Sequence, residues 1–177
     1  MKIRLENVLK ERKTTVEEAF KLFDELEPAT PDFMIGRWKG ISINSGHRLD
    51  GKLEHSGWYG KVFFNLEEVH PLLYFTEDKT AIYSVEPTSL FGRTEHTGKE
   101  EATRVFEKTK EAKARLRNTE YRGRSCATMV YDELPILDVF VKIDDTKVLG
   151  VMDLKGDPEP FFFVLERDNQ STIHLDV

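Results

Sequence analysis

The chain has 177 residues, 39% of them hydrophobic and 33% charged, and its net charge is -6. This length suits one domain with its own core, and the composition excludes both a disordered chain and a membrane-spanning one, because no apolar run approaches the ~20 residues that cross a bilayer. An acidic chain lacks the basic face that phosphate backbones require, so we expect no nucleic-acid partner.

Two local features bear on the cellular compartment. The first eight residues carry charges where a secretory signal needs an unbroken apolar stretch, which predicts a cytoplasmic protein. Cys126 is the only cysteine, so no internal disulfide can form, and a lone cysteine in a strand-like run is typical of a small buried residue.

The first predicted element is an amphipathic helix over residues 15 to 26. Thr15 and Glu18 have the spacing of a capping box, in which the threonine hydroxyl accepts a hydrogen bond from the amide three residues later. The apolar residues Val16, Phe20 and Phe23 then lie on one helical stripe. Such a helix is stable when its stripe lies across an apolar surface.

Short strand-like runs follow, over residues 38–44, 61–64, 72–75 and 81–85. Both tryptophans fall in this part of the chain, within the clusters Gly36-Arg37-Trp38-Lys39-Gly40 and Gly57-Trp58-Tyr59-Gly60. Flanking glycines let other backbone pass close to a large indole, so the clusters indicate points of close packing.

The second half of the chain begins with an ambiguous segment. Residues 99–117 combine a partial helical stripe with many charges, so we predict a charged helix or an ordered loop there. Residues 103–124 carry eight basic side chains against three acidic ones. Beyond them the strand pattern is strongest, over residues 120–131, 136–143, 147–154 and 161–165.

These elements predict an all-β protein with minor α. Few connections are long enough for a βαβ crossover, which disfavours a parallel sheet, and closure of the sheet on itself removes exposed edges. We therefore expect one domain over residues 1–177, an antiparallel closed or nearly closed β-barrel with the N-terminal helix at one end. Residues 30–98 and 118–167 would form its two halves.

Some predicted strands carry apolar side chains on both faces, so both faces must be buried. Along residues 136–143 one face is aliphatic, whereas the other carries Asp138, Phe140 and Lys142. The runs 147–154 and 161–165 are apolar on both faces. We expect the protein's own helix on the outer face, with a lining for a ligand or a dimer contact as alternatives.

The order of motifs resembles a known family. The first half is similar to the GXWXG family of bacterial and fungal proteins at Gly36-x-Trp38-x-Gly40, Gly46-His47-x-Leu49-Asp50-Gly51, Gly57-Trp58-Tyr59-Gly60-Lys61 and Val69-His70-Pro71-Leu72. The second half resembles the domain of unknown function that accompanies it, at Glu120-Tyr121-Arg122-Gly123, Ala127-Thr128-Met129-x-Tyr131-Asp132, Pro135-Ile136-x-Asp138-x-Phe140 and Gly150-x-Met152-Asp153-x-Lys155-Gly156. The resemblance implies no settled activity and assigns no catalytic residue. Arg48 departs from the pattern, because relatives more often have proline after the histidine.

A weaker likeness is to the calycins, the lipocalin and fatty-acid-binding barrels. Their first strand also carries Gly-x-Trp after a short helix, and the indole closes the barrel floor beneath a basic residue. This likeness implies a calycin-like barrel, from which function follows by analogy alone.

The ionisable residues show no metal or nucleotide motif. The histidines lack the paired spacing of zinc ligands, and no Walker loop or serine elbow is present, so we expect neither a metal nor a cofactor. His47 and His70 lie in turn-like contexts, where a ring ordinarily locks a loop. Asp138 lies in mid-strand, so it is the acidic residue best placed for acid–base chemistry, with His70 or a second carboxylate. Arg122 and Arg124 share one face, which suits an anionic group or solvated ion pairs.

Three functional hypotheses follow. The leading one is a noncatalytic protein that binds an apolar or amphipathic ligand, such as a fatty acid or phospholipid, in a barrel cavity. The predicted ligand-binding residues are Trp38, Trp58, Arg122, Arg124, Asp138, Phe140, Lys142, Phe161 and Phe163. The second hypothesis is a small-molecule enzyme that uses His70, Asp138 or His47. The third is a module that contacts an anionic membrane or a protein through residues 103–124, with an outer apolar face as a homodimer surface.

Overall fold

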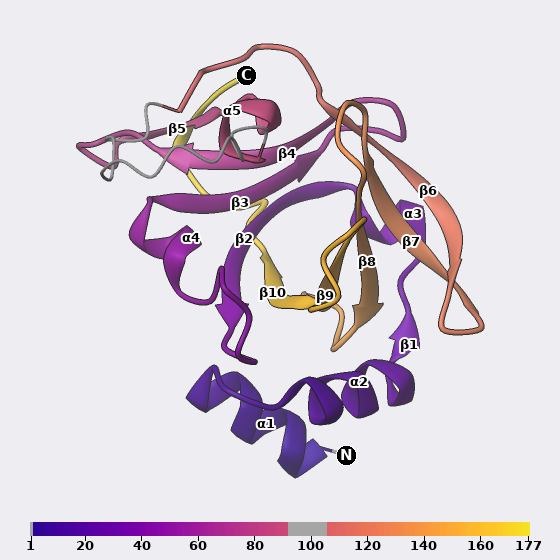
Figure 1. The fold of residues 1–177 in the computed structure, drawn as a ribbon. Helices are drawn as coiled ribbons and strands as arrows, with labels where there is room; N and C mark the ends of the chain where they lie inside the picture. Colours follow the sequence, from indigo (N-terminus) through magenta and orange to yellow (C-terminus); the bar gives the residue numbers. More distant parts are fainter. Residues whose placement is uncertain (1, 92–105) are drawn as a thin grey trace.

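The computed structural model describes residues 2–91 and 106–177, and strands are the most frequent regular structure among these residues (Figure 1). The helices are α1 (Lys2–Glu11), α2 (Val16–Glu25), α3 (Pro31–Met34), α4 (Lys52–His55) and α5 (Pro87–Phe91). The strands are β1 (Glu27–Pro28), β2 (Gly36–Ile43), β3 (Trp58–Phe63), β4 (Val69–Phe75), β5 (Ala81–Ser84), β6 (Ala114–Tyr121), β7 (Arg124–Tyr131), β8 (Ile136–Lys142), β9 (Lys147–Leu154), β10 (Phe161–Arg167) and β11 (His174–Asp176). Within the described ranges, no helix has both the length and the apolar character needed to cross a membrane.

The strands form one mixed sheet whose hydrogen bonds follow a ring-like path. Their order is β11-β5-β4-β3-β2-β10-β9-β8-β7-β6, and β1 pairs with the end of β8. A further pairing of Val69 in β4 with Ala114 in β6 joins two strands that are distant in this order. The prediction of a mostly β fold is confirmed, although β11 pairs with β5 in parallel and was not predicted.

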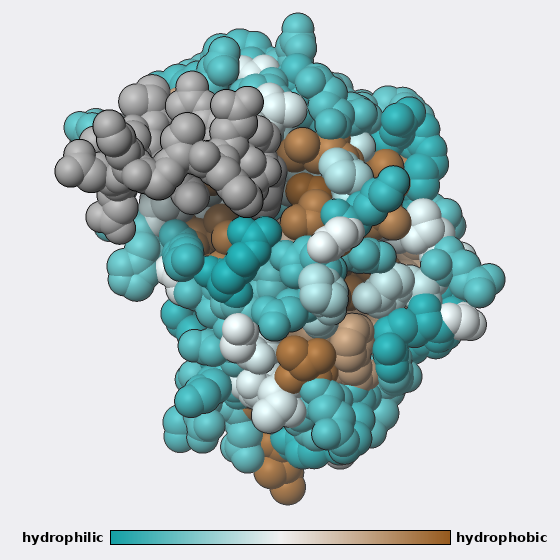
Figure 2. Space-filling view, viewed as in Figure 1, coloured by the Kyte–Doolittle hydropathy of each residue, from teal (hydrophilic) through white to brown (hydrophobic). Residues whose placement is uncertain are grey.

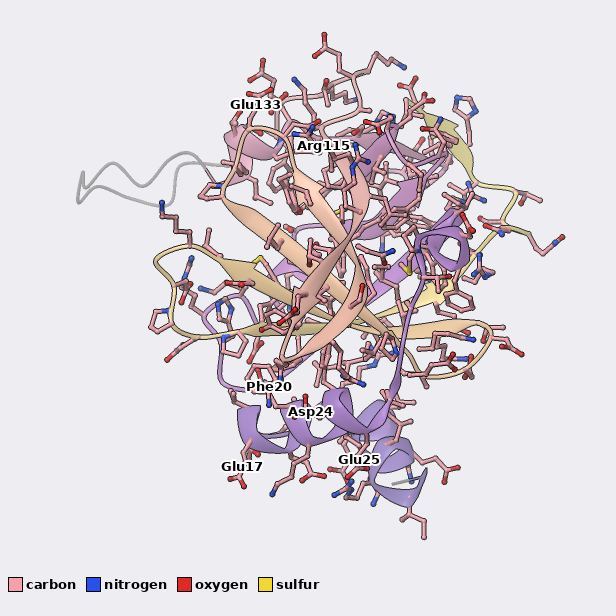
Figure 3. The ribbon with its side chains drawn as sticks, turned by 90° about the vertical axis from the view of Figure 1, so that its right-hand side faces the viewer. Glu17, Phe20, Asp24, Glu25, Arg115 and Glu133 are labelled. Atoms are coloured by element: carbon pink, nitrogen blue, oxygen red, sulfur yellow. The ribbon has the colours of Figure 1, made fainter. Side chains whose placement is uncertain are left out.

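The predicted N-terminal helix forms as α2. The hydroxyl of Thr15 accepts a hydrogen bond from the amide of Glu18 at 3.2 Å, as the capping box requires. Phe20 points from α2 toward the strands, whereas Glu17 points away from them (Figure 3). Replacing Thr15 with alanine should therefore lower the free energy of unfolding by about 1 kcal/mol, measured by urea denaturation. Thr15→Ser keeps the capping oxygen and should cost less than half as much; equal losses would contradict this role.

Helices α1 and α2 cover the outer face of the sheet, not one end of the ring as expected. Buried residues of α2 pack against the outward side chains of β8, β9 and β10: Ala19, Leu22 and Phe23 against Val139, Val141, Leu149, Val151, Phe162 and Val164. Cys126 is buried in the same cluster, as predicted for a lone cysteine. The strands are apolar on both faces because this outer face meets the helices while the inner face forms the main core.

The main core lies on the inner face and is rich in aromatic side chains. Its large members are Trp38, Trp58, Phe63, Tyr74, Tyr131, Phe140, Phe161 and Phe163. A third, smaller cluster lies outside β3, β4 and β5, where Tyr59 and Leu73 meet Leu175 near the C-terminus. The two faces of β3, β4 and β5 therefore belong to different hydrophobic clusters.

Two sequence predictions in the second half need correction. Of the segment 99–117, predicted as a charged helix or an ordered loop, residues 99–105 lie outside the described residues, 106–113 agree with the loop alternative and not with the helix, and the strand β6 begins at Ala114. The run 120–131, expected as one strand, contains the end of β6, a turn and β7. Arg122 and Gly123 form this turn with positive φ angles of 51° and 75°, which match the right-handed twist of a hairpin.

Candidate functional site

The two Gly-Trp-Gly clusters pack against each other across the β2–β3 pair. Trp38 is paired with Lys61, and Lys39 with Gly60. A Cβ atom at Gly40 would lie well under 3.0 Å from the indole of Trp58, and one at Gly60 would collide with the carbonyl oxygen of Trp38. These glycines therefore permit the close approach of strands and rings that the motif predicted.

Trp38 is fully buried in the main core beside the short helix α3. Its Nε1 donates a hydrogen bond to the carbonyl of Met34 at 2.7 Å, and the guanidinium carbon of Arg167 lies 4.2 Å from the centroid of its ring. Arg167 also donates to the carbonyls of Phe33 and Ile35, at 2.6 and 2.9 Å. All these partners belong to the chain itself, so Trp38 is a core residue.

Lys61 and Asp138 form a buried ion pair on the inner face. Nζ of Lys61 lies 2.8 Å from Oδ2 of Asp138 and donates to the carbonyl of Pro71 at 3.0 Å. Lys61 is 3% exposed and Asp138 1%. Burial raises the pKa of Asp138, while the ammonium group of Lys61 acts in the opposite direction. Desolvating two charges is expensive, so such a pair is weak evidence for stability and a reasonable marker of function.

A β-bulge turns Lys61 inward. Strict alternation from Trp58 would place Gly60 and Val62 on the inner face and Lys61 on the outer one. The pairing of β3 with β4 shifts register on both sides of Gly60, whose φ is 150°. Sequence reasoning missed Lys61 for this reason. The available signal was the glycine inside a strand, since such glycines often mark bulges.

The space beside the ion pair is nearly filled. The cavity lined by Asp138, Lys61 and Trp58 measures about 20 Å³, too small for a lipid chain. Phe140 packs edge-to-face against Phe63 and Phe163, with ring centroids 5.9 and 6.2 Å apart. The predictions for Trp38 and Phe140 as ligand wall are therefore corrected, because their rings are packed by the protein's own side chains.

A larger pocket opens at the end of the ring near the β7–β8 and β9–β10 loops. It has a volume of about 560 Å³, within the range of small-ligand sites. Its apolar wall consists of Leu49, Leu53, Leu90, Leu134, Ile136 and Leu154, and its charged residues are Arg48, Lys52, Lys155 and Asp157. Sequence reasoning missed this pocket because most of its residues come from turns and from the short helices α4 and α5, while Ile136 and Leu154 stand at the ends of strands, so no single pattern groups them. Figure 2, which has the view of Figure 1, shows hydrophobic surface near the middle of the face turned to the viewer, bordered by hydrophilic side chains.

His47 locks the loop at this opening, as its turn-like context predicted. Its Nδ1 accepts a hydrogen bond from the amide of Leu49 at 3.1 Å, and its Nε2 lies 3.5 Å from Oδ2 of Asp157. Arg48 pairs with the same carboxylate at 3.2 Å. The loop after β2 and the loop after β9 are thereby held together at the rim of the pocket.

Arg122 and Arg124 lie outside the ring, against the C-terminal end of α2. Arg122 makes a two-pronged ion pair with Asp24, with both contacts at 2.7 Å, and Arg124 donates to the carbonyls of Leu26 and Phe23. Basic side chains at a helix C-terminus donate hydrogen bonds to the backbone carbonyls that have no partner within the helix. The two arginines do share a face, but their anionic partner is the helix and not a ligand head group.

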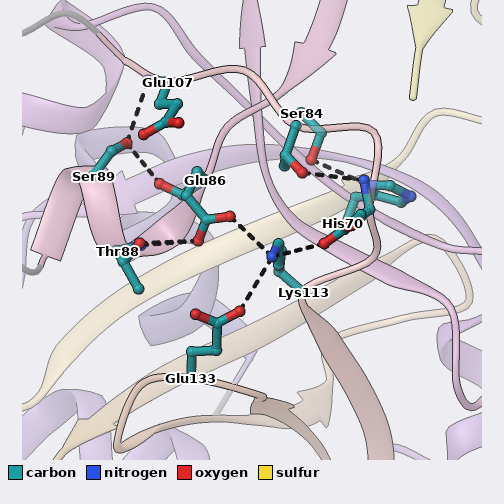
Figure 4. Close-up of polar contacts among 10 residues, drawn as sticks. His70, Ser84, Glu86, Thr88, Ser89, Glu107, Lys113 and Glu133 are labelled. Carbon is teal, nitrogen blue, oxygen red and sulfur yellow. Dashed lines mark hydrogen bonds and ion pairs between the residues drawn. The ribbon is translucent and has the colours of Figure 1, made fainter.

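Lys142 and His70 also lie apart from Asp138. Nζ of Lys142 is 4.7 Å from the centroid of the aromatic ring of Phe33, which belongs to α3. His70 contacts the hydroxyl of Ser84 at 3.0 Å (Figure 4), and burial lowers the pKa of its imidazole. Among the described residues no hydrogen bond or ion pair joins His70 to Asp138, so the predicted acid–base partnership is corrected. Phe161 and Phe163 line the small cavity with Trp58, and their role as a wall for a ligand stays a prediction.

The basic residues in the described part of 103–124 are largely neutralised by the chain itself. Lys113 lies 3.0 Å from Glu111 and 3.1 Å from both Glu86 and Glu133, the last two of which are shown in Figure 4. The carboxylates of Glu111, Glu86 and Glu133 raise its pKa. Arg115 pairs with Asp132 and Arg117 with Glu67. This segment offers little unpaired positive charge to a membrane. Within the described ranges no cluster of three metal-ligating side chains occurs.

The sequence and the fold match known proteins. Residues 21–79 match the family model described as GXWXG protein, and residues 112–167 match the domain of unknown function DUF4334. The chain therefore belongs to the family in which a GXWXG region is followed by this domain, which confirms the resemblance. No curated protein matches the chain. The crystal structure of a protein from Thermomonospora curvata is 33% identical, with a TM-score of 0.73 over 93% of this chain and 96% of that one.

Proposed function

We propose that the protein is a noncatalytic binder of a small apolar ligand with an anionic group, held in the pocket of about 560 Å³ at the ring opening. The observation that carries this proposal is the division of the pocket into a leucine-rich wall and a basic rim. Among the described residues Arg48 is paired with Asp157, whereas Lys52 and Lys155 have no ion-pair partner. Two ammonium groups above an apolar wall suit an amphipathic acid of medium length.

The proposal includes a calycin-like architecture, in which the eight strands from β4 to β6 close into a barrel. The β4–β6 pairing and the contact of Arg167 with the Trp38 indole support it. The ligand would lie at the open end and not along the axis, because aromatic side chains fill the interior. This location differs from the fatty-acid cavity expected from sequence.

Decanoate is a suitable probe, since it joins a ten-carbon apolar chain to one carboxylate. Titration calorimetry should detect its binding, and the double variant Lys52→Glu/Lys155→Glu should weaken it about tenfold at low salt, because the variant replaces attraction by repulsion at the rim. Saturating decanoate should also raise the melting temperature of the wild type.

Lys10→Glu on α1 is the matched control for charge, because α1 does not line the pocket. It should leave decanoate affinity within about twofold. Equal weakening by Lys10→Glu and by the rim variant would show general electrostatic attraction, and absence of any binding would contradict the proposed site.

A second candidate function is an enzyme in which Asp138 transfers a proton. The observation that favours it is a buried carboxylate of raised pKa, 2.8 Å from a lysine and close beneath the pocket. Lys61 then replaces His70 as its partner. A screen of small metabolites with Asp138→Asn as the comparison tests this role, and turnover that survives the change would eliminate it.

A further inference from the structure

The pocket and the buried ion pair are separated by a thin apolar partition. Leu49 and Leu53 line both the pocket at the opening and the small cavity behind it. Leu53 belongs to the four-residue helix α4, and Leu49 to the turn before it. A rotation of these two side chains would connect the pocket with the cavity, whose wall includes Asp138, Lys61 and Trp58.

Two residues that line this cavity each carry a polar atom without a hydrogen-bond partner among the described residues. The atoms are Oδ1 of Asp138 and Nε1 of Trp58, and both atoms are buried. A buried polar atom without a partner has lost its hydrogen bonds to water and gained none in return, so two such atoms on one small cavity require an explanation. One is an acceptor and the other a donor.

We propose that this cavity is a polar subsite that receives a hydroxyl group of the ligand, with Oδ1 of Asp138 accepting its hydrogen and Nε1 of Trp58 donating to its oxygen. This inference rests on the proposed binding function and specifies the ligand's inner end. A cavity of about 20 Å³ has room for one group the size of a water molecule.

The charges around the cavity select among chemical groups. A carboxylate would lie beside the unpaired oxygen of Asp138, whose charge is already balanced by Lys61. An ammonium group would face both Lys61 and the N–H of Trp58. A carbonyl would satisfy Trp58 but leave Asp138 unpaired. A hydroxyl alone among these groups satisfies both atoms without adding charge. The ligand is therefore a hydroxy acid whose carboxylate stays at the basic rim.

The test compares plain carboxylic acids of six, eight, ten and twelve carbons with ω-hydroxy acids of the same lengths, by titration calorimetry. In a purely apolar pocket a terminal hydroxyl weakens binding, because it loses its hydrogen bonds to water. In the proposed subsite it should strengthen binding at least tenfold at one chain length. Whether the hydroxyl strengthens or weakens binding therefore separates the polar subsite from a purely apolar pocket. The range of chain lengths makes no assumption about how far the cavity lies from the basic rim.

Two variants assign the preference to these atoms. Trp58→Phe removes the N–H donor and keeps an aromatic ring, and Lys61→Met/Asp138→Leu removes the ion pair without leaving a lone charge. Both should abolish the preference for the hydroxyl and leave the affinity for the plain acids within about threefold. Binding of plain acids with no hydroxyl preference at any length, or a preference that survives in both variants, would overturn the subsite while the pocket stands. Absence of binding by either series would overturn the pocket itself.

Discussion

Gly60→Ala is expected to lower the free energy of unfolding by about 3 kcal/mol or more, measured by urea denaturation. A methyl group at this position would collide with the backbone carbonyl of Trp38, and backbone cannot rotate away as a side chain can. The φ angle of 150° adds strain for any residue with a Cβ atom. The bulge that turns Lys61 inward would have to flatten or the β2–β3 pair would have to separate.

Gly123→Ala provides the matched control. Gly123 also has a positive φ, of 75°, but no atom lies within 4 Å of the position of an added Cβ. This variant should lose only about 1 kcal/mol, from backbone strain alone. If the two variants lost equal stability, the collision with Trp38 would not be the cause. Gly40→Ala should fall between them, because the atoms it meets belong to the Trp58 side chain.

Local patterns predicted most of the fold. The capping box and apolar stripe of α2 agree with the structure because a helix end and its buried face depend on residues within a few positions. The run 120–131 is predicted as one strand but contains the end of β6, a turn and β7, because Arg122 adopts a positive φ that is more usual for glycine or asparagine. The pairing of β11 with β5 joins segments about 90 residues apart in sequence, which local patterns do not encode.

The candidate site was predictable only in part. A carboxylate in mid-strand is costly without a partner, so Asp138 was identified from its own strand. Its partner was missed, because Lys61 reaches the inner face only through the register shift at Gly60. Arg122 and Arg124 were assigned to a ligand because sequence does not show that α2 ends beside them. The basic rim of the pocket was not predictable either, because Arg48, Lys52 and Lys155 come together only where separate segments of the folded chain meet.

The second large effect concerns the buried ion pair. Lys61→Met should cost about 3–5 kcal/mol at pH 7, because the buried carboxyl group of Asp138 then either carries a charge without a counter-charge or holds a proton that the unfolded chain releases. The double variant Lys61→Met/Asp138→Leu should recover most of this loss and unfold within about 1 kcal/mol of the wild type, since no charge is then desolvated. Denaturant unfolding of the three proteins measures both values. The exposed pair of Lys147 and Glu166, 3.3 Å apart, is the control, and its disruption should cost under about 1 kcal/mol.

The cost of Lys61→Met should also depend on pH. Burial raises the pKa of Asp138 and Lys61 opposes this rise, so removing Lys61 should raise the pKa further. The folded variant then holds a proton that the unfolded chain, with an aspartate pKa of about 3.9, has already released, so its stability falls as pH rises above that value. Relative to the wild type at the same pH, the loss should be smallest near pH 5 and grow toward pH 8, whereas the double variant should lack this slope. A loss that does not change with pH would mean that the carboxylate of Asp138 finds another counter-charge once Lys61 is gone.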